Sequence, residues 1–353
     1  MAGDSDSIVA DTAARICADL ADPQAVNRAK DGAWKAPLWR ALTDAGLPLA
    51  WVPDHLGGSG AAMQDGFAVL GVAGRTALAV PLAETLLAGW LLARANIASP
   101  ANAMTVAPVR LHDRIMLAAD GTLVGHASAV PFAAEAAHIA VLADSAAGPV
   151  VALVAARDCR LSQRRSVTDD GSATVVLDGV KPLAHAPAGI DCETLMLMGG
   201  VVRAVQTAGA LEAVLTMSVA YANERVAFER PIGKFQAVQQ NLARLAGEVA
   251  AALAVSGSAA DTMAQTDVSD DAVVLEAASA KIRCAEAAQE GAAIAHQVFG
   301  AIGFTQEHVL HRFTLRMLAW RDDFGNESHW AAELGRRVAR RGADDFWPLV
   351  ASR

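Results

Sequence analysis

The last part of the chain contains three long helical patterns in succession, and helices of such length have few ways to fold. They cover residues 192–227, 236–265 and 270–299. Pro231 and Gly233 separate the first from the second, and Ser269 or Asp270 can cap the third. Shorter helical patterns follow to about residue 340. Because long helices bury their apolar faces by packing side by side, this arrangement predicts an antiparallel bundle.

The rest of the chain divides into two parts that differ in the spacing of their apolar residues. Before about residue 115, apolar residues recur at helical spacing, with proline and glycine breaks. From about residue 116, short β-rich runs such as "HIAVLAD" and "PVVALVAAR" alternate with Asp-Gly and similar turn signals, which predicts a compact antiparallel sheet. No crossover helices alternate with these runs, which argues against a parallel dinucleotide-binding sheet. The expected fold is mainly α with a small β domain: an N-terminal helical domain (1–115), a middle antiparallel β domain (116–190) and a C-terminal four-helix-bundle domain (191–353).

Composition excludes several classes of function. A net charge of −9 argues against nucleic-acid binding, which requires a basic face. The most apolar window, "ALAVPLAETLLAGWLLARA", is interrupted by Pro81, Glu84 and Gly89, so it is expected to be a buried helix and not a membrane span. No signal peptide opens the chain, and the four widely spaced cysteines are expected to be idle thiols of a reducing cytoplasm.

The most unusual stretch is "YANERVAFERPIGKFQAVQQNLA", residues 221–243. A helix ends near Arg225, a Pro-Ile-Gly turn follows, and Gln236 opens the next helix. Helix N-terminal N–H groups, an arginine and an amide side chain together suit a pyrophosphate. The residues alone favour an ordinary helix connection that carries an exposed arginine over such a site.

This stretch resembles the R-x-x-F-G-x-P-I-x-x-x-Q signature of the acyl-CoA dehydrogenase family. A second stretch, "HQVFGAIGFTQEHVLHRFTLR" (residues 296–316), is similar to the family's Q-x-x-G-G-x-G-[FY] segment, and "LWRALTDAGLPLAWVPDHLGGSG" (38–60) to its N-terminal run. The family's order of domains is also helical, β and helical. The resemblance therefore covers nearly the whole chain.

The resemblance implies FAD as the cofactor, bound where two subunits meet. The bundle of one subunit then holds the ADP half of the FAD seated in its neighbour. By position, the residues lining that half would be Arg225, Ala227, Phe228, Ile232, Phe235, Gln236 and Gln239, with Gln297, Gly300 and Ala301 approaching from the other side. Glu229 and Ala301 depart from the pattern, because the family usually has glycine at both positions.

The β domain resembles the family less. The family's "TEP…GSD" segment is absent. Its "W-I-[ST]" strand, which seats the flavin ring, reads "ASAVPFAAE" here, with Val130 and Pro131 at the last two positions. Pro131 lacks both the N–H and the hydroxyl that such a site offers, so we expect this chain to hold a flavin ring poorly.

The catalytic base is the other departure. Family members use a glutamate, either after the aromatic residue of a "Y-E-G-T" segment or on the first bundle helix. Both positions are glycine in this chain, Gly325 and Gly199. Glu327 and Asp323 are weak substitutes; with Asp322, they are more typical of solvated or helix-capping charges.

The other polar and aromatic candidates favour structural roles. His308 and His311, with Glu307 beside them, lack the spacing of a metal site, and no metal is expected. Trp320 and Trp330 are expected to pack and not to stack on a cofactor.

The resemblance predicts a subunit of an FAD-dependent acyl-CoA dehydrogenase. Short chains ending in a similar "W-R-D-E-F-G" segment occur in the family as partners of a longer subunit, in α2β2 enzymes for steroid side-chain, dicarboxylic or similarly bulky acyl-CoA esters. Electron-transfer flavoprotein is the acceptor that the resemblance implies. The alternatives are a self-sufficient homo-oligomeric enzyme with a relocated base, a flavin-free scaffold subunit, and a flavin-dependent oxidase or monooxygenase.

Overall fold

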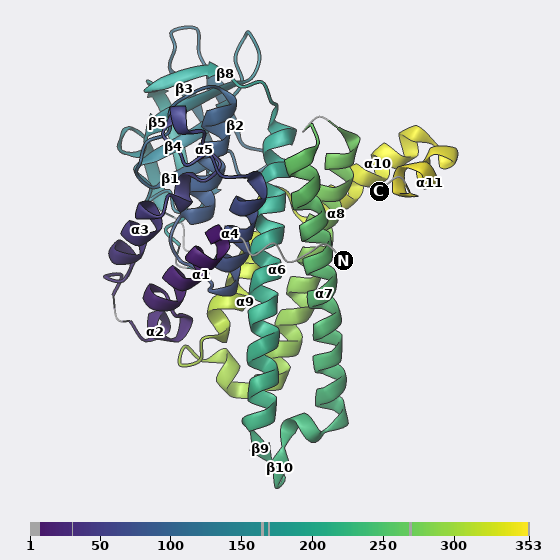
Figure 1. Cartoon of the computed structure of the whole chain (residues 1–353). Coiled ribbons are helices and arrows are strands. Elements are labelled where there is room, and N and C mark those ends of the chain that lie inside the picture. The colour runs from purple at the N-terminus through teal and green to yellow at the C-terminus, as the bar shows by residue number, and fades with distance from the viewer. Residues whose placement is uncertain (1–7, 30, 164–165, 169, 268–269, 352–353) are drawn as a thin grey trace.

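The computed structural model describes residues 8–29, 31–163, 166–168, 170–267 and 270–351 of the 353-residue chain. Figure 1 shows N-terminal helices beside one end of a long bundle, and β-sheets at that same end. The N-terminal elements are α1 (Ile8–Leu20), α2 (Pro23–Arg28), α3 (Lys35–Asp44), η1 (Leu47–Leu49), η2 (Asp54–Leu56), α4 (Met63–Arg75) and α5 (Leu82–Arg94). Helix α5 contains most of the apolar window and is almost entirely buried, as expected from its sequence.

The middle region forms two four-stranded sheets, with orders β1-β4-β5-β8 and β2-β3-β7-β6. The elements are β1 (Met104–Ala107), β2 (Arg114–Leu117), β3 (Leu123–Val130), β4 (His138–Ala143), β5 (Val150–Ala155), η3 (Ala156–Asp158), β6 (Arg160–Gln163), β7 (Ala173–Val180) and β8 (Ala184–Pro187). Pairing is antiparallel except for β1, which pairs with β4 in parallel, Met104 opposite His138. Strand β1 also precedes residue 116, so this strand lies inside the stretch that was predicted to be helical.

The C-terminal region is the predicted bundle. Its elements are α6 (Cys192–Glu224), β9 (Val226–Ala227), β10 (Arg230–Pro231), η4 (Ile232–Lys234), α7 (Gln236–Gln265), α8 (Asp271–Phe299), η5 (Gly300–Phe304), α9 (Leu310–Trp320), α10 (Glu327–Arg341) and α11 (Ala343–Ala351). The Asp191 carboxylate accepts from the Thr194 N–H at the start of α6, and Asp270 accepts from Ala272 at the start of α8. Asp270 is thus the cap of the third long helix, while Ser269 lies outside the described residues.

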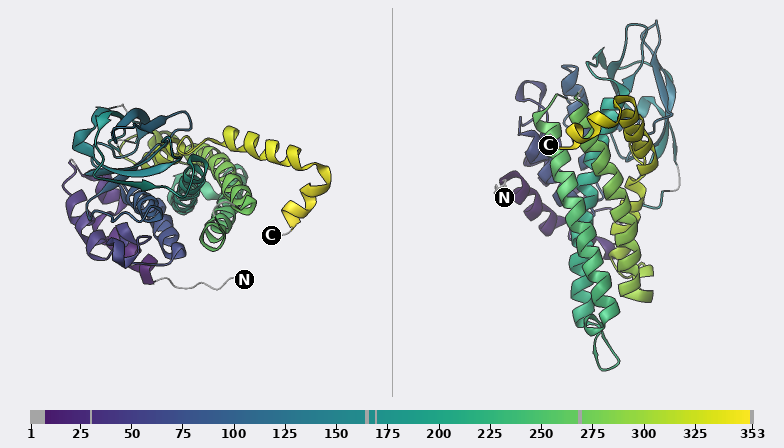
Figure 2. Two further views of the ribbon diagram at one scale, coloured as in Figure 1. Left: turned by 90° about the horizontal axis from the view of Figure 1, so that it is seen from above. Right: turned by 90° about the vertical axis from the view of Figure 1, so that its right-hand side faces the viewer.

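Helix α6 is the centre of the molecule. It packs against α4, α7, α8 and α9, and its most apolar 18-residue window is 94% buried. The corresponding window of α7 is only 28% buried, since this helix lies at the outside of the bundle. Figure 2 shows α10 and α11 projecting from the bundle as an arm. The architecture confirms the predicted fold class, mainly helical with a small β region.

Candidate functional site

The first candidate site is the far end of the bundle, where α6 connects to α7. Helix α6 ends at Glu224, and the hairpin of β9 and β10 follows with Phe228 and Glu229 in its turn, at φ values of 51° and 64°. Figure 1 shows this hairpin as the tip of the molecule, remote from the sheets. Glu229 therefore occupies a left-handed conformation that glycine would adopt without strain, and its side chain is exposed.

The second stretch that resembles the family lies beside the first. The rings of Tyr221, near the end of α6, and Phe299, the last residue of α8, are 4.4 Å apart. Gly300 then reverses the chain with a φ of 64°, and η5 begins. Residues far apart in the sequence, the ends of α6 and α8, thus form one surface, which we call the bundle-end face: the exposed residues of 225–239 and 297–301.

The bundle-end face is open to a second subunit. The predicted residues that are exposed on it are Arg225, Phe228, Gln236, Gln239, Gln297, Gly300 and Ala301, whereas Ala227, Ile232 and Phe235 are half-buried. Arg225 makes no ion pair with any other described residue, so its charge is available to an anion. Gln239 differs, because its Nε2 donates to the Gly233 carbonyl at 2.9 Å and so braces η4. Arg230 was not among the residues predicted from the sequence, but its guanidinium lies 4.2 Å from the centre of the Phe235 ring.

The two glycines at the usual base positions both lie near Phe324: Gly199 faces its ring, and Gly325 follows it in the chain. An added Cβ at Gly199 would be 2.4 Å from the ring of Phe324, so no larger residue fits there unless the ring moves. Phe324 is 2% exposed, and its N–H donates to the Val109 carbonyl at 3.0 Å. Gly325 has a φ of 86°, where side chains are strained. Phe324 thus fills the space at Gly199, whereas an added Cβ at Gly325 would be 2.7 Å from the Trp330 Nε1.

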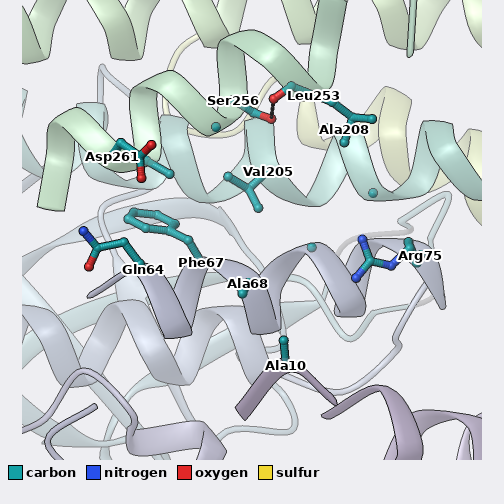
Figure 3. Close-up of a pocket in the computed structure, with 14 residues that line it drawn as sticks. Ala10, Gln64, Phe67, Ala68, Arg75, Val205, Ala208, Leu253, Ser256 and Asp261 are labelled. Carbon is teal, nitrogen blue, oxygen red and sulfur yellow. Dashed lines mark hydrogen bonds between the residues drawn. The ribbon is translucent and has the colours of Figure 1, made fainter. Parts of the chain in front are cut away.

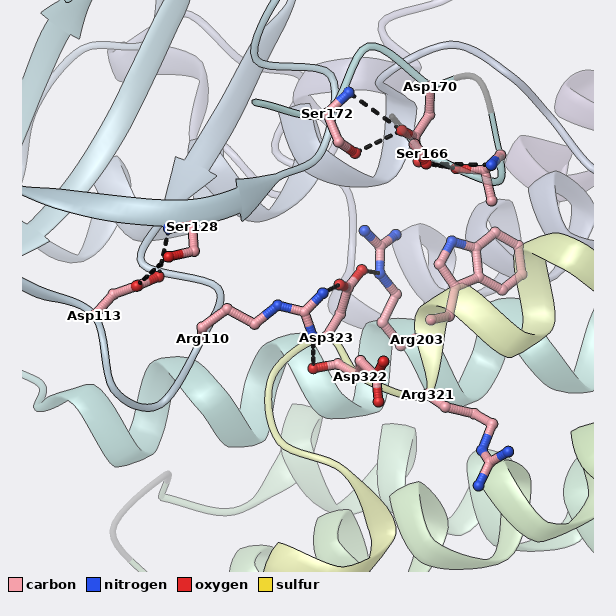
Figure 4. Close-up of polar contacts among 12 residues, drawn as sticks. Arg110, Asp113, Ser128, Ser166, Asp170, Ser172, Arg203, Arg321, Asp322 and Asp323 are labelled. Atoms are coloured by element: carbon pink, nitrogen blue, oxygen red, sulfur yellow. Dashed lines mark hydrogen bonds and ion pairs between the residues drawn. The ribbon is translucent and has the colours of Figure 1, made fainter. Parts of the chain in front are cut away.

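A buried ion cluster lies beside this ring. The Arg203 guanidinium donates to Glu84 at 2.7 Å, to Asp323 at 3.0 Å and to the Gln206 amide oxygen at 2.7 Å. These four residues are 4–6% exposed. Burial alone would lower the pKa of Arg203, but the carboxylates of Glu84 and Asp323 outweigh it and raise that pKa, so the guanidinium remains charged. Arg110 lies at the edge, 3.4 Å from Asp323 (Figure 4).

The strand that would seat a flavin ring adjoins the same region. Pro131 accepts a hydrogen bond from the Thr105 hydroxyl at 2.7 Å through its carbonyl and has no N–H to offer a ligand. The space between Pro131, Val202, Arg203 and Phe324 does not admit a water molecule. We call this region, where the base positions and the ring-seating strand meet, the home site. Around Phe324 and Arg203 this region is filled by protein atoms.

A pocket of about 240 Å³ adjoins the home site, and Ala129 and Pro131 of the ring-seating strand are among its lining residues. Figure 4 shows Arg110, Asp322 and Asp323 facing Ser166 and Asp170 across it. Asp170 is engaged with its neighbours, because its carboxylate accepts from the Thr168 and Ser172 hydroxyls at 2.5 Å each. None of these groups provides an unpaired buried acid next to the home site.

The acids that were considered from the sequence as substitutes for the base, Glu327 and Asp323, also have ion-pair partners. Glu327 pairs with Arg321 at the start of α10. Burial alone would raise the pKa of Glu327, but a backbone N–H and the Arg321 guanidinium lower it, which makes the carboxylate a weak base. Asp323 belongs to the buried cluster, and Asp322 is exposed.

The histidines and tryptophans have structural roles. The His308 ring accepts from the Leu310 N–H at 3.1 Å, and the His311 ring lies 2.7 Å from the His308 carbonyl, so both belong to the start of α9. Within the described part of the chain, no group of three or more potential ligands could hold a metal ion. Trp320 and Trp330 are buried, and the Trp330 Nε1–H donates to the Phe324 carbonyl at 2.9 Å.

Lys281 holds the end of α9 against the bundle and gives a pH prediction. Its buried amine donates to the carbonyls of Trp320 and Arg321 at 2.7 and 2.8 Å. Burial lowers the pKa of Lys281 from 10.5 to about 8. The unfolded chain therefore binds this proton more tightly, and the resulting penalty, about 3 kcal/mol, is present below pH 8 and is relieved as the pH rises from 8 to 10.5.

We expect wild type to gain unfolding free energy relative to Lys281→Met across that window. Urea unfolding of both proteins between pH 7 and pH 10 measures this difference. Parallel pH profiles for the two proteins would contradict it.

A further cavity has no relation to these residues. Figure 3 shows it between α4, α6 and α7, with a volume of about 320 Å³. Small residues form much of its lining, and Arg75 on its rim pairs with Glu212 at 3.1 Å. No residue that the resemblance assigns to FAD or to the base lines this cavity.

A helical region, a small β region and a long helical bundle follow one another in the order that the resemblance implied. Residues 193–329 match the family model described as "Acyl-CoA dehydrogenase, C-terminal domain". The acyl-CoA dehydrogenase IpdE2 of Mycobacterium tuberculosis is 30% identical over 345 residues, which are 96% of each chain. The chain belongs to the acyl-CoA dehydrogenase family.

Solved structures agree with this assignment. A chain of the ChsE4-ChsE5 complex from Mycobacterium tuberculosis superposes with a TM-score of 0.85 and 26% identity, over 97% of this chain and 99% of that one. A chain of the Tcur3481-Tcur3483 steroid acyl-CoA dehydrogenase superposes with a TM-score of 0.82 and 25% identity, over 94% of this chain and 97% of that one. The recognition of the family from the three sequence motifs is therefore confirmed.

Proposed function

We propose that this chain is the half-site subunit of an α2β2 acyl-CoA dehydrogenase. A half-site subunit supplies one part of a shared binding surface while its partner supplies the rest. In this proposal the bundle-end face holds the ADP half of an FAD whose flavin ring is seated in a longer partner subunit. The partner also provides the glutamate base and most of the acyl pocket.

The filled home site is the observation that carries this proposal. Phe324 fills the space beside Gly199, and the Arg203 cluster occupies the interior behind it. A positioned general base contributes about 10²- to 10⁴-fold in rate, and the described residues offer none that is free at this place. The bundle-end face, by contrast, is open.

The residues of the bundle-end face suit an anionic dinucleotide. Arg225 provides an exposed guanidinium without an internal partner, which can donate to a diphosphate. Gln236 and Gln297 provide exposed amides, and the position of a Cβ at Gly300 meets no atom within 4 Å, so a ligand can approach the backbone there. When bound, FAD would accept the hydride that leaves the acyl β-carbon.

Exposed apolar surface supports assembly with another subunit. Phe228 is 89% exposed and Phe304 is 74% exposed, and both lie at the bundle end. Large exposed rings and the apolar outer side of α7 are typical of surfaces that a partner covers. Two of the similar structures, ChsE4-ChsE5 and Tcur3481-Tcur3483, each pair two differently named proteins.

The substrate proposal rests on the relatives. The Tcur3481-Tcur3483 protein is a steroid acyl-CoA dehydrogenase, and we extend this to a bulky acyl-CoA, such as a steroid side-chain thioester, as the substrate of the assembled enzyme. Electron-transfer flavoprotein is the proposed acceptor and the cytoplasm the proposed location.

Expression of the chain alone, and together with a longer acyl-CoA dehydrogenase subunit from the same source, tests the proposal. We expect a colourless protein alone and one FAD per pair of unlike chains in the complex, read from flavin absorbance. One FAD per copy of this chain alone, with turnover of acyl-CoA, would establish a self-sufficient enzyme instead. A complex without flavin would establish a scaffold subunit, and rapid oxygen consumption an oxidase.

Arg225→Ala should weaken flavin retention in the complex by about 10- to 100-fold, because charge-assisted hydrogen bonds contribute about 1.5–3 kcal/mol. The dissociation constant for FAD, measured by fluorescence after removal of the cofactor, gives the change. Arg157→Ala is the matched control, since the Arg157 side chain is 87% exposed and η3 directly follows β5, which Figure 1 shows at the opposite end of the molecule from the β9–β10 hairpin. Equal retention in both variants would mean that the face does not hold the dinucleotide.

A further inference from the structure

A polar pocket of about 320 Å³ lies between the N-terminal helices and the bundle, away from both the bundle-end face and the home site. Its residues come from four parts of the chain: the segment around α2 and α3, the connection between α4 and α5, the loop before β7, and α9. The Asn27 side chain donates to the Gln306 carbonyl at 3.0 Å and so ties α2 to the segment before α9. The lining residues are Val26, Ala29, Asp31, Gly32, Trp34, Lys35, Ala79, Thr168, Arg312 and Arg316.

Three cationic side chains line this pocket. Arg312 and Arg316 are one helical turn apart on α9, so they lie on the same face of the helix. Lys35 comes from the first residue of α3, and its amine is 2.6 Å from a Glu135 carboxylate oxygen. A pocket wall with two guanidinium groups is unusual, since each presents several N–H donors in a fixed plane.

Arg312 has no counterion. Its Nε is buried and makes no hydrogen bond, and its guanidinium pairs with no carboxylate among the described residues. Burial lowers the pKa of Arg312, and no neighbouring charge offsets it. A half-buried cation without a partner is unfavourable, so such a group is typically compensated by a ligand or a second molecule.

The nearby acids are occupied elsewhere. Asp31, which lines the pocket, accepts from the Ala33 N–H at 3.0 Å. Glu135 is paired with Lys35, and Asp170 is held by hydroxyl groups. Among the residues that the structure describes, none therefore provides an acceptor for the Arg312 side chain in this pocket.

We propose that this pocket binds a phosphate group, with Arg312 as its principal ligand. The guanidinium matches phosphate oxygens bidentately. A volume of about 320 Å³ admits one phosphate with a few waters, or the phosphorylated end of a larger molecule, and not a whole dinucleotide. The site is independent of the proposed half-site function.

Equilibrium titration of the full chain with inorganic phosphate tests the proposal, with 3′-AMP, coenzyme A and acetate as further probes. We expect phosphate to bind and acetate to bind at least tenfold more weakly. Tighter binding of 3′-AMP or coenzyme A than of phosphate would assign the group to a nucleotide end, and equal binding would assign it to the free anion. No binding of any phosphate compound would overturn the proposal.

Variants separate a ligand role from a structural one. Arg312→Met should abolish phosphate binding while holding or raising the unfolding midpoint, because it removes an uncompensated buried charge. Phosphate should raise the midpoint of wild type and leave that of Arg312→Met unchanged. Arg157→Met is the control, and it should behave as wild type. A variant that loses stability without phosphate present, and still binds phosphate as wild type does, would contradict the assignment.

Discussion

Arg203→Met is expected to lower the free energy of unfolding by about 3–5 kcal/mol. The substitution removes the cation from a cluster whose members are 4–6% exposed, so Glu84 loses its ion-pair partner and Asp323 keeps only Arg110, 3.4 Å away at the edge of the cluster. Denaturant unfolding followed by circular dichroism measures the loss. Because the chain is large, a separate transition of the β region should be checked before one free energy is assigned.

Two controls define the cause of this loss. Arg75→Met removes a cation from an ion pair with Glu212 whose side chains are 43% and 42% exposed, and it should cost less than about 1 kcal/mol. Replacement of Arg203, Glu84 and Asp323 together by leucine should recover most of the stability, because apolar groups of similar size can replace a buried ion network. A loss as small for Arg203→Met as for Arg75→Met would show that the cluster is not a buried network in solution.

The cluster explains how the interior can remain folded without a ligand. Phe324, Arg203 and the partners of Arg203 fill this region, and the space between them does not admit a water molecule. The backbone of the α9–α10 connection is fixed by the same groups, through Phe324 to Val109 and Lys281 to the end of α9. The residues that fill the home site therefore also hold the α9–α10 connection in place. This double role of the filled interior is the physical basis of the half-site proposal.

Patterns with a local cause could be predicted from the sequence. The bounds of α7 were obtained from the apolar pattern and the Pro231–Gly233 break, and Asp270 as a cap from its residue type. The three motifs identified the family, and the two glycines at the base positions indicated that something was lost. Each of these features depends on residues that are neighbours in the chain.

What replaced the base could not be predicted, because it depends on contacts between distant segments. Arg203, Glu84 and Asp323 come from α6, α5 and the end of α9, and only the fold brings them together. A signal was present, since Glu84 and Arg203 are charged residues within apolar helical runs, and such residues are rarely buried unless paired. Strand β1 was missed for a related reason: its parallel partner β4 is more than thirty residues away.

Gly199→Glu, which restores the residue type of a family base, is expected to destabilise the chain by more than about 3 kcal/mol and to confer no activity. Its Cβ would be 2.4 Å from the Phe324 ring, so overpacking adds about 1–3 kcal/mol and burial of a carboxylate adds more. Soluble yield and the denaturation midpoint measure the effect. Gly247→Glu on the outer side of α7 is the matched control, because nothing lies within 4 Å of its Cβ position.

The double variant Gly199→Glu with Phe324→Ala tests whether the ring is the obstacle. Each change alone is destabilising, but removal of the ring makes room for the glutamate, so the combined loss should be smaller than the sum by about 0.5–3 kcal/mol. Acyl-CoA oxidation should stay absent, because Arg203 would pair with the new carboxylate and Pro131 would still offer no N–H to a flavin. A stable Gly199→Glu protein that binds flavin and oxidises acyl-CoA by itself would show that the home site can open, and the half-site function would have to be abandoned.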